Sequence, residues 1–130
     1  MDSSDIRSGL YQGLRREHGF EPLKVEGTLP AELAGTLYRN GPGLFGSHGR
    51  RYYHLFEGQG AVTAVRFVDG AALGASRVID GAGLQEERAA GRALYDSAAP
   101  RGRRIANRLR GRGKNTANVN VIAWQGRVFG

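Results

Sequence analysis

The sequence predicts an all-β fold, and three observations support this prediction. Glycine supplies 21 and proline 4 of the 130 residues, a share of turn-forming residues that favours many short strands over long helices. Residues 61–68 alternate between two faces, as a half-buried strand does. Asp69 and Gly70 form a dipeptide typical of a two-residue turn, and the next residues read as a returning strand. We therefore expect an antiparallel hairpin over residues 61–79.

The N-terminal part reads as an arm followed by short strands. Residues 1–24 are polar, and Ile6, Leu10 and Leu14 recur among them at helical spacing, so we expect a short helical arm. From residue 25 the pattern changes to short β-prone runs that glycine interrupts, and we treat 25–130 as one partial domain. Its first part is expected to contain a strand at 36–39, a turn at 40–43 and a strand at 52–56.

The C-terminal part is expected to contain a partly helical connector and a second hairpin. The connector covers residues 81–93, which show little periodicity. Residues 117–124 read as a strand, Gln125 and Gly126 as a turn, and 127–129 as the start of the return strand. The chain ends while this hairpin is still open, and natural domains rarely leave such an edge unpaired. We therefore expect the N-terminal piece of a longer protein.

The composition excludes several classes of protein. A chain of 130 residues holds one small domain. It has no cysteine, which excludes disulfides, thiolate metal sites and cysteine nucleophiles. No run approaches the roughly 18 apolar residues of a membrane-spanning helix, and the first five residues are acidic where a signal peptide is basic. We expect a cytoplasmic protein.

The net charge of +7 is concentrated in one segment, which we call the basic segment and bound at 97–114. Residues 97–130 carry 8 basic and no acidic side chains, whereas residues 1–96 carry 11 basic and 12 acidic ones. The basic segment is compatible with a solvated loop or with peripheral contact to an anionic membrane, which a short helix would make through Arg101, Arg104, Ile105, Arg108 and Leu109. It has no aromatic residue for base stacking, so we expect no nucleic-acid partner.

Several separated segments, in their order and spacing, resemble the opening of the carotenoid cleavage oxygenases, a family that includes stilbene-cleaving dioxygenases and the retinoid isomerase of the eye. The segments that carry the resemblance are Gly27–Pro30, Gly35–Phe45, Tyr53–Gly60, Val65–Phe67 and Lys114–Asn118. Thr63 departs from the pattern, because the family often has histidine there. A phosphate-binding loop at 41–46 is excluded, since the Gly-Lys-Ser/Thr ending is missing.

The resemblance implies a seven-bladed β-propeller with a non-haem Fe(II) at its axis. In the family, iron held by four histidines and O2 cleave a conjugated double bond of a carotenoid, apocarotenoid or stilbene into two carbonyl products. Those histidines lie further along the chain than Gly130, so we expect no metal ligand and no catalytic residue here. His18, His48 and His54 are interpreted as structural or exposed. By itself the chain is expected to be an inactive N-terminal fragment, and a truncated stub stays an alternative.

Three residues correspond to substrate neighbours of the family. Phe45 resembles an aromatic side chain that lines the substrate cleft, although a residue of a small satellite core would have the same character. Tyr95 falls near an aromatic residue that contacts substrate, and its hydroxyl could equally be a surface group. Val119 stands where many bacterial members have threonine next to the open position of iron, or it is an ordinary strand valine. We predict substrate contact for all three.

Overall fold

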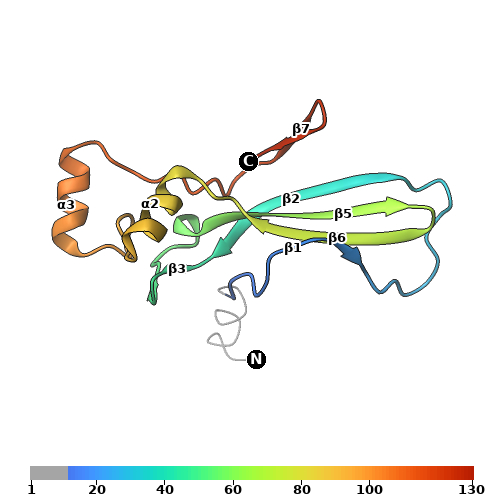
Figure 1. The fold of residues 1–130 in the computed structure, drawn as a ribbon, viewed down its shortest axis with the longest axis horizontal. Helices are drawn as coiled ribbons and strands as arrows, with labels where there is room; N and C mark the ends of the chain where they lie inside the picture. The colour runs from blue at the N-terminus through green and yellow to red at the C-terminus, as the bar shows by residue number, and fades with distance from the viewer. Residues whose placement is uncertain (1–11) are drawn as a thin grey trace.

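The computed structural model describes residues 12–130, and most of their regular structure is β (Figure 1). The strands are β1 (His18–Pro22), β2 (Gly35–Leu44), β3 (Gly46–Ser47), β4 (Arg50–Arg51), β5 (Gln59–Val68), β6 (Ala71–Val78), β7 (Ile122–Trp124) and β8 (Arg127–Phe129). The helices are a 3-10 turn η1 (Leu55–Glu57), α2 (Ala82–Ala90) and α3 (Arg101–Leu109). The described residues therefore agree with the predicted fold class in being mostly β, with few helices.

The predicted hairpin is the centre of the main sheet. Strands β5 and β6 pair from Ala61 with Val78 to Val68 with Ala71. The turn residues Asp69 and Gly70 have φ values of 49° and 72°, the left-handed backbone that a type I′ turn requires. The sheet is antiparallel with the order β1-β6-β5-β2. Its long strands run away from α2 and α3, which lie at the opposite end of the molecule (Figure 1).

Strand β2 is longer than predicted, and the expected turn at 40–43 is wrong. These residues continue the pairing with β5, where Pro42 lies opposite Gly60. Proline is tolerated there because β2 is an edge strand and the missing N–H would not face a neighbour. The register shifts between Pro42 and Leu44, and at Gly43 a Cβ would lie 2.3 Å from the Cβ of Ala61. The glycine therefore permits close approach of the two strands.

The predicted helical arm is wrong over residues 12–22, while residues 1–11 lie outside the described part of the chain. Residues 12–17 are irregular, and β1 pairs with the edge of β6, with His18 opposite Ser76. The N–H of Leu23 extends this pairing to the carbonyl of Ala72 at 2.9 Å. A short, weakly periodic helix is marginal in water, so hydrogen bonds to a free strand edge determine the conformation instead.

The strand predicted at 52–56 is also wrong, because local side chains cap a 3-10 turn there. The Nδ1 of His54 accepts the N–H of Phe56 at 3.2 Å, and the carboxylate of Glu57 accepts the N–H of Tyr53 at 3.1 Å. These side-chain bonds compete with strand pairing. The connector at 81–93 does contain a helix, α2, as predicted.

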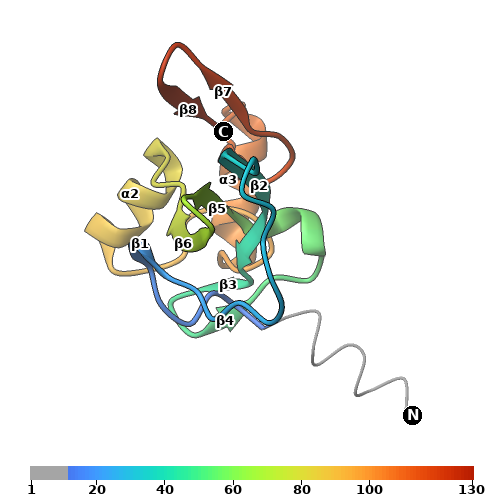
Figure 2. The ribbon, with the colours of Figure 1, turned by 90° about the vertical axis from the view of Figure 1, so that its right-hand side faces the viewer.

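Half of the basic segment is a helix, which corrects the interpretation of the segment as a solvated loop. Helix α3 covers its centre, and the side-chain amide of Asn107 donates to the carbonyl of Leu94 at 2.7 Å, which fixes the inner face of the helix. Within residues 12–130 no helix is long and apolar enough to cross a membrane. The β7–β8 hairpin forms at the predicted turn and projects from the rest of the chain (Figure 2).

The core is small and contains polar as well as apolar side chains. Its buried apolar members are mostly alanines, with Tyr52, Leu84, Leu94 and Tyr95. The largest fully buried side chains are Gln59 and Glu87, both polar. A buried amide or carboxylate is tolerated only when hydrogen bonds replace the water that it loses. The partners of these two side chains therefore organise the region between the sheet and the helices.

Candidate functional site

The residues Asn115–Asn120, which we call the asparagine segment, contain the predicted site residue Val119 and form no strand. The strand predicted at 117–124 is confirmed only at Ile122–Trp124. Ala117 has a left-handed φ of 48°, which interrupts an extended run. Backbone groups of the segment instead bond to side chains from elsewhere: the amide of Asn40 donates to the carbonyls of Ala117 at 3.0 Å and Asn120 at 2.6 Å.

The first residues of β5 form hydrogen bonds to the asparagine segment. The buried amide of Gln59 donates to the carbonyls of Ile79 at 2.8 Å and Thr116 at 3.3 Å. The N–H of Gly60 donates to the same Thr116 oxygen at 2.6 Å. A Cβ at Gly60 would lie 1.9 Å from the carbonyl oxygen of Ala117, so only glycine fits this contact. The segment is thereby packed directly on the backbone of the sheet.

Asn118 anchors the middle of the segment. Its side-chain nitrogen donates to the carbonyls of Phe56 at 2.9 Å and Gly58 at 2.7 Å. Because two carbonyls converge on one terminal atom, that atom must be the NH2 group, which has two hydrogens to give. The side chain is buried, so both bonds are shielded from water.

Val119 and Tyr95 line two adjoining pockets. Val119 is 84% exposed and borders a pocket of about 210 Å³, while Tyr95 is buried and borders one of about 440 Å³. Both pockets are also lined by Asn115, Ala117 and Gly130. The structure therefore brings Tyr95 and Val119 to the two sides of the asparagine segment.

The hydroxyl of Tyr95 is held by a carboxylate. It donates to Oε2 of Glu86 at 2.5 Å, and this hydrogen bond, together with burial and the charge of Glu86, raises the pKa of the phenol. Arg112 lies 3.6 Å from the same Oε2. Tyr95 thus remains a neutral hydrogen-bonded phenol and presents an aromatic wall to its pocket.

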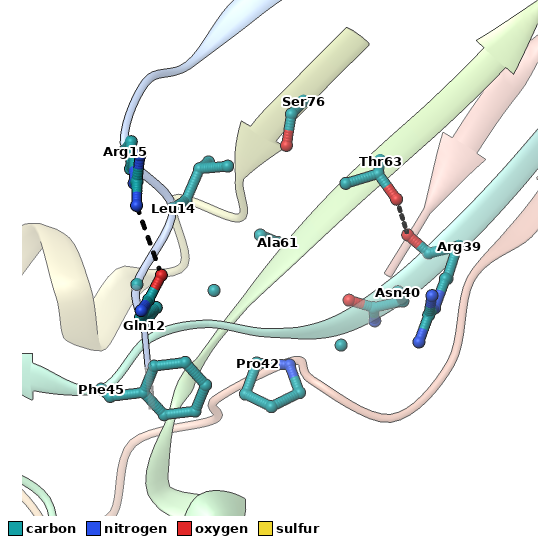
Figure 3. A pocket seen from close by; sticks show the side chains of 13 residues that line it. Gln12, Leu14, Arg15, Arg39, Asn40, Pro42, Phe45, Ala61, Thr63 and Ser76 are labelled. Atoms are coloured by element: carbon teal, nitrogen blue, oxygen red, sulfur yellow. Dashed lines mark hydrogen bonds between the residues drawn. The ribbon is translucent and has the colours of Figure 1, made fainter. Parts of the chain in front are cut away.

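Phe45 lies in a different pocket, of about 540 Å³, between β2, β5, β6 and residues 12–15 (Figure 3). Ser76 and Asn40 are among its lining residues, and the Ser76 hydroxyl and the side-chain oxygen of Asn40 are buried without a hydrogen-bond partner in the described chain. Asn40 thus lines this pocket, and its side-chain nitrogen also donates to the asparagine segment. The three predicted residues therefore line three separate pockets of this chain.

A buried ion cluster lies just before the asparagine segment. We call it the Lys114 cluster; it contains Lys114, Glu87, Asp96, Tyr52 and Ser47. The ammonium of Lys114 donates to the Tyr52 hydroxyl at 2.9 Å and to Glu87 at 3.2 Å, and it lies 3.4 Å from Asp96. Burial acts to lower the pKa of Lys114, but Tyr52 and the two carboxylates raise it above its usual value. The sequence patterns gave no signal for this cluster.

The histidines have local partners. Nδ1 of His48 lies 2.9 Å from the Ser47 hydroxyl, Nδ1 of His18 lies 2.8 Å from the Gly19 carbonyl, and His54 caps η1. Among residues 12–130, no three His, Cys, Asp or Glu side chains are grouped so that they could hold a metal ion. The described residues therefore do not fit an iron centre of their own.

Solved structures of apocarotenoid oxygenases contain the same arrangement of strands and helices. A variant chimera of apocarotenoid oxygenase and RPE65 superposes with a TM-score of 0.83 at 35% identity, over 97% of this chain and 27% of that chain. Cobalt-substituted apocarotenoid oxygenase of Synechocystis superposes with a TM-score of 0.79 at 36% identity, over 92% of this chain and 26% of that chain. The fold therefore defines a carotenoid oxygenase class of protein, and the second structure indicates a metal cofactor in that relative.

Curated relatives give the same result in sequence. Apocarotenoid-15,15'-oxygenase of Synechocystis is 47% identical over 57 residues, which are 44% of this chain and 12% of the relative. Human beta,beta-carotene 15,15'-dioxygenase is 42% identical over 60 residues, which are 45% of this chain and 11% of the relative. The match therefore covers only about a tenth of the length of these enzymes.

The model of the RPE65 family, described as retinal pigment epithelial membrane protein, matches residues 11–130. The chain belongs to this family of carotenoid cleavage oxygenases, which confirms the resemblance found in the sequence.

Proposed function

We propose that this chain is the N-terminal part of a non-haem Fe(II) dioxygenase with a seven-bladed propeller, which cleaves a conjugated C=C bond of a carotenoid, apocarotenoid or stilbene. The observation that carries this proposal is the agreement with the chimera of apocarotenoid oxygenase and RPE65 over 97% of the chain, at a TM-score of 0.83. In this proposal the iron ligands come from residues outside the chain, and the chain itself supplies walls of the substrate site. A catalytically inactive stub is the alternative.

The walls would be Phe45, Tyr95 and Val119. A polyene or a phenyl ring is apolar, so its transfer from water to a pocket of aromatic and aliphatic side chains is favourable in free energy. Val119 fits this role because its side chain is exposed on a segment that four hydrogen bonds from Asn40, Gln59 and Gly60 hold in place. Tyr95 supports it from the adjoining pocket.

The proposal is tested in the complete protein that carries this segment, loaded with Fe(II) and supplied with an apocarotenoid under O2. We expect loss of polyene absorbance with formation of two carbonyl products. Val119→Ala should lower kcat/KM by about tenfold, because two methyl groups that contact the apolar substrate are lost. The matched control is Val128→Ala on β8, which should leave kcat/KM unchanged. Absence of O2-dependent products would overturn the proposed function, and equal effects of the two variants would remove Val119 from the substrate site.

A second function is peripheral membrane contact through α3, for a protein located in the cytoplasm. Ile105 is 54% and Leu109 84% exposed, and they lie four residues apart on one face of the helix. Asn107 lies two residues from both Ile105 and Leu109 and faces the interior. Because residues two apart on a helix are separated by about 200° around its axis, Ile105 and Leu109 lie on the opposite, outer face. The exposed face therefore carries two apolar side chains among arginines, the pattern of a helix at an anionic membrane surface; these arginines are Arg101, Arg104 and Arg108.

Vesicle co-sedimentation tests this contact with the 130-residue chain. We expect binding to vesicles that contain phosphatidylserine, weaker binding at higher salt, and at least about a fivefold loss in the Ile105→Ser/Leu109→Ser variant. Leu37→Ser, at a 65% exposed position of β2, is the control and should bind normally. Binding that is equal for neutral and anionic vesicles, or stronger for RNA in a filter assay, would contradict the proposal.

A further inference from the structure

The Lys114 ammonium has three polar neighbours inside the protein. It donates hydrogen bonds to the Tyr52 hydroxyl and to the Glu87 carboxylate, and it forms an ion pair with Asp96, whose Oδ2 lies 3.4 Å away. The side chains of Lys114 and Glu87 are both fully buried. The stem of Lys114 packs on α2 so closely that a Cβ at Gly83 would lie 2.4 Å from its Cγ. The position of this ammonium is therefore determined from several sides.

Glu87 connects the ammonium to the backbone at Tyr95. One carboxylate oxygen accepts the N–H groups of Leu94 at 3.0 Å and Tyr95 at 3.1 Å. The other accepts from Lys114 at 3.2 Å and from the Ser47 hydroxyl at 3.3 Å. One carboxylate thus joins the backbone that carries Tyr95 to the residue that immediately precedes the asparagine segment.

We infer that Lys114 is a positioning residue, whose ion pair with Glu87 fixes the asparagine segment, and with it Val119, relative to Tyr95. This inference rests on the proposed function, in which Tyr95 and Val119 are walls of the substrate site. The bonds from Asn40, Gln59 and Asn118 tie the segment to the sheet and η1, whereas the Lys114–Glu87 pair ties its beginning to α2 and residues 94–95. The two pockets share three lining residues, so this link sets their relative geometry.

The test separates a positioning role from a general contribution to stability. Lys114→Met alone leaves Glu87 buried without its cation and should destabilise the whole chain. In the Lys114→Met/Glu87→Gln variant the two charges of the Lys114–Glu87 pair are removed and that of Asp96 remains. The glutamine can still accept the N–H groups of residues 94 and 95 and donate to Ser47. Because Glu87 is no longer a buried charge without its cation, the urea midpoint of this variant should lie above that of Lys114→Met; Asp96, whose side chain is 21% exposed, still loses its ion pair with Lys114.

Amide hydrogen exchange of the 130-residue chain is the readout that does not depend on catalysis. In the double variant we expect exchange at residues 115–121 to be at least about tenfold faster, with no change in the hairpin at 61–78. Lys24→Met, at an exposed ion pair with Glu26, is the control and should leave both regions unchanged. Unchanged exchange at 115–121, equal acceleration in the hairpin, or unfolding of the double variant would overturn the positioning role.

A kinetic measurement on the complete protein then connects positioning to function. The double variant should lower kcat/KM for an apocarotenoid by about tenfold. An additional Val119→Ala change should cost less than it does in the wild type, because the valine is no longer held in place. Full additivity of the two effects would overturn the inference. If exchange responds as expected and the complete protein has no oxygenase activity, the proposed function fails while the structural coupling stands.

Discussion

Replacing Gly60 with alanine should detach the asparagine segment from β5 and lower the free energy of unfolding by about 3 kcal/mol. The new Cβ would lie 1.9 Å from the carbonyl oxygen of Ala117, 2.6 Å from its carbonyl carbon and 2.9 Å from the Thr116 oxygen. All three are backbone atoms, so no flexible side chain can move aside. The separation would also break the bond from the Gly60 N–H to Thr116. Urea denaturation followed by circular dichroism measures the loss.

Gly41→Ala is the matched control. Gly41 lies on the neighbouring strand β2, paired with Ala61, and an added Cβ there meets no atom within 4 Å. Alanine should stabilise this position slightly, by about 0.5 kcal/mol, because glycine loses more backbone freedom on folding. If both variants lost the same stability, the effect at Gly60 would reflect strand propensity and not the contact with Ala117.

The elements that could be predicted from the sequence are those fixed by neighbouring residues. The β5–β6 hairpin depends on alternation and on the Asp69-Gly70 turn, and the helix in 81–93 lies within one segment. The prediction failed where distant residues decide. Residues 18–22 form a strand because the edge of β6 is free, and Pro42 stays in β2 because β2 is an edge strand. Neither edge can be recognised before the order of the strands is known.

The candidate site shows the same limit. The family resemblance located Phe45, Tyr95 and Val119, but local patterns gave no reason for their arrangement. The asparagine segment reads as a strand by its alternation, yet its carbonyls bond to Asn40 and Gln59, which lie 57 to 80 residues earlier. Lys114 lies in the basic segment and Glu87 in the predicted connector, and no local pattern indicates their pairing across 27 residues, which requires the packing of α2 against residue 114. Burial of a polar side chain therefore cannot be predicted from the sequence until its distant hydrogen-bond partners are known.

The second large effect is expected for Asn118→Asp, which should lower the free energy of unfolding by about 3–5 kcal/mol at pH 7. The side-chain nitrogen of Asn118 donates to two carbonyls, at 2.9 Å and 2.7 Å. A carboxylate has no hydrogen to give and would place a buried negative charge against both oxygens. Asn115→Asp and Asn120→Asp are the matched controls, because those side chains accept the N–H groups of Ala117 and Val121, which a carboxylate also does. Both controls should stay within about 0.5 kcal/mol of the wild type.

The pH dependence identifies the cause of this destabilisation. Burial beside two carbonyls would raise the folded-state pKa of the carboxyl introduced by Asn118→Asp above its unfolded value of about 3.9. The protonated acid can donate one hydrogen bond, so the deficit should be smallest below about pH 4, grow as pH rises towards the folded-state pKa and then stay constant. Urea midpoints of this variant and of Asn120→Asp, measured between about pH 3 and pH 8, test the sign. If the deficit were equally large at low pH, the packing of the Asn118 side chain, and not its two donated hydrogen bonds, would be what holds the asparagine segment in place.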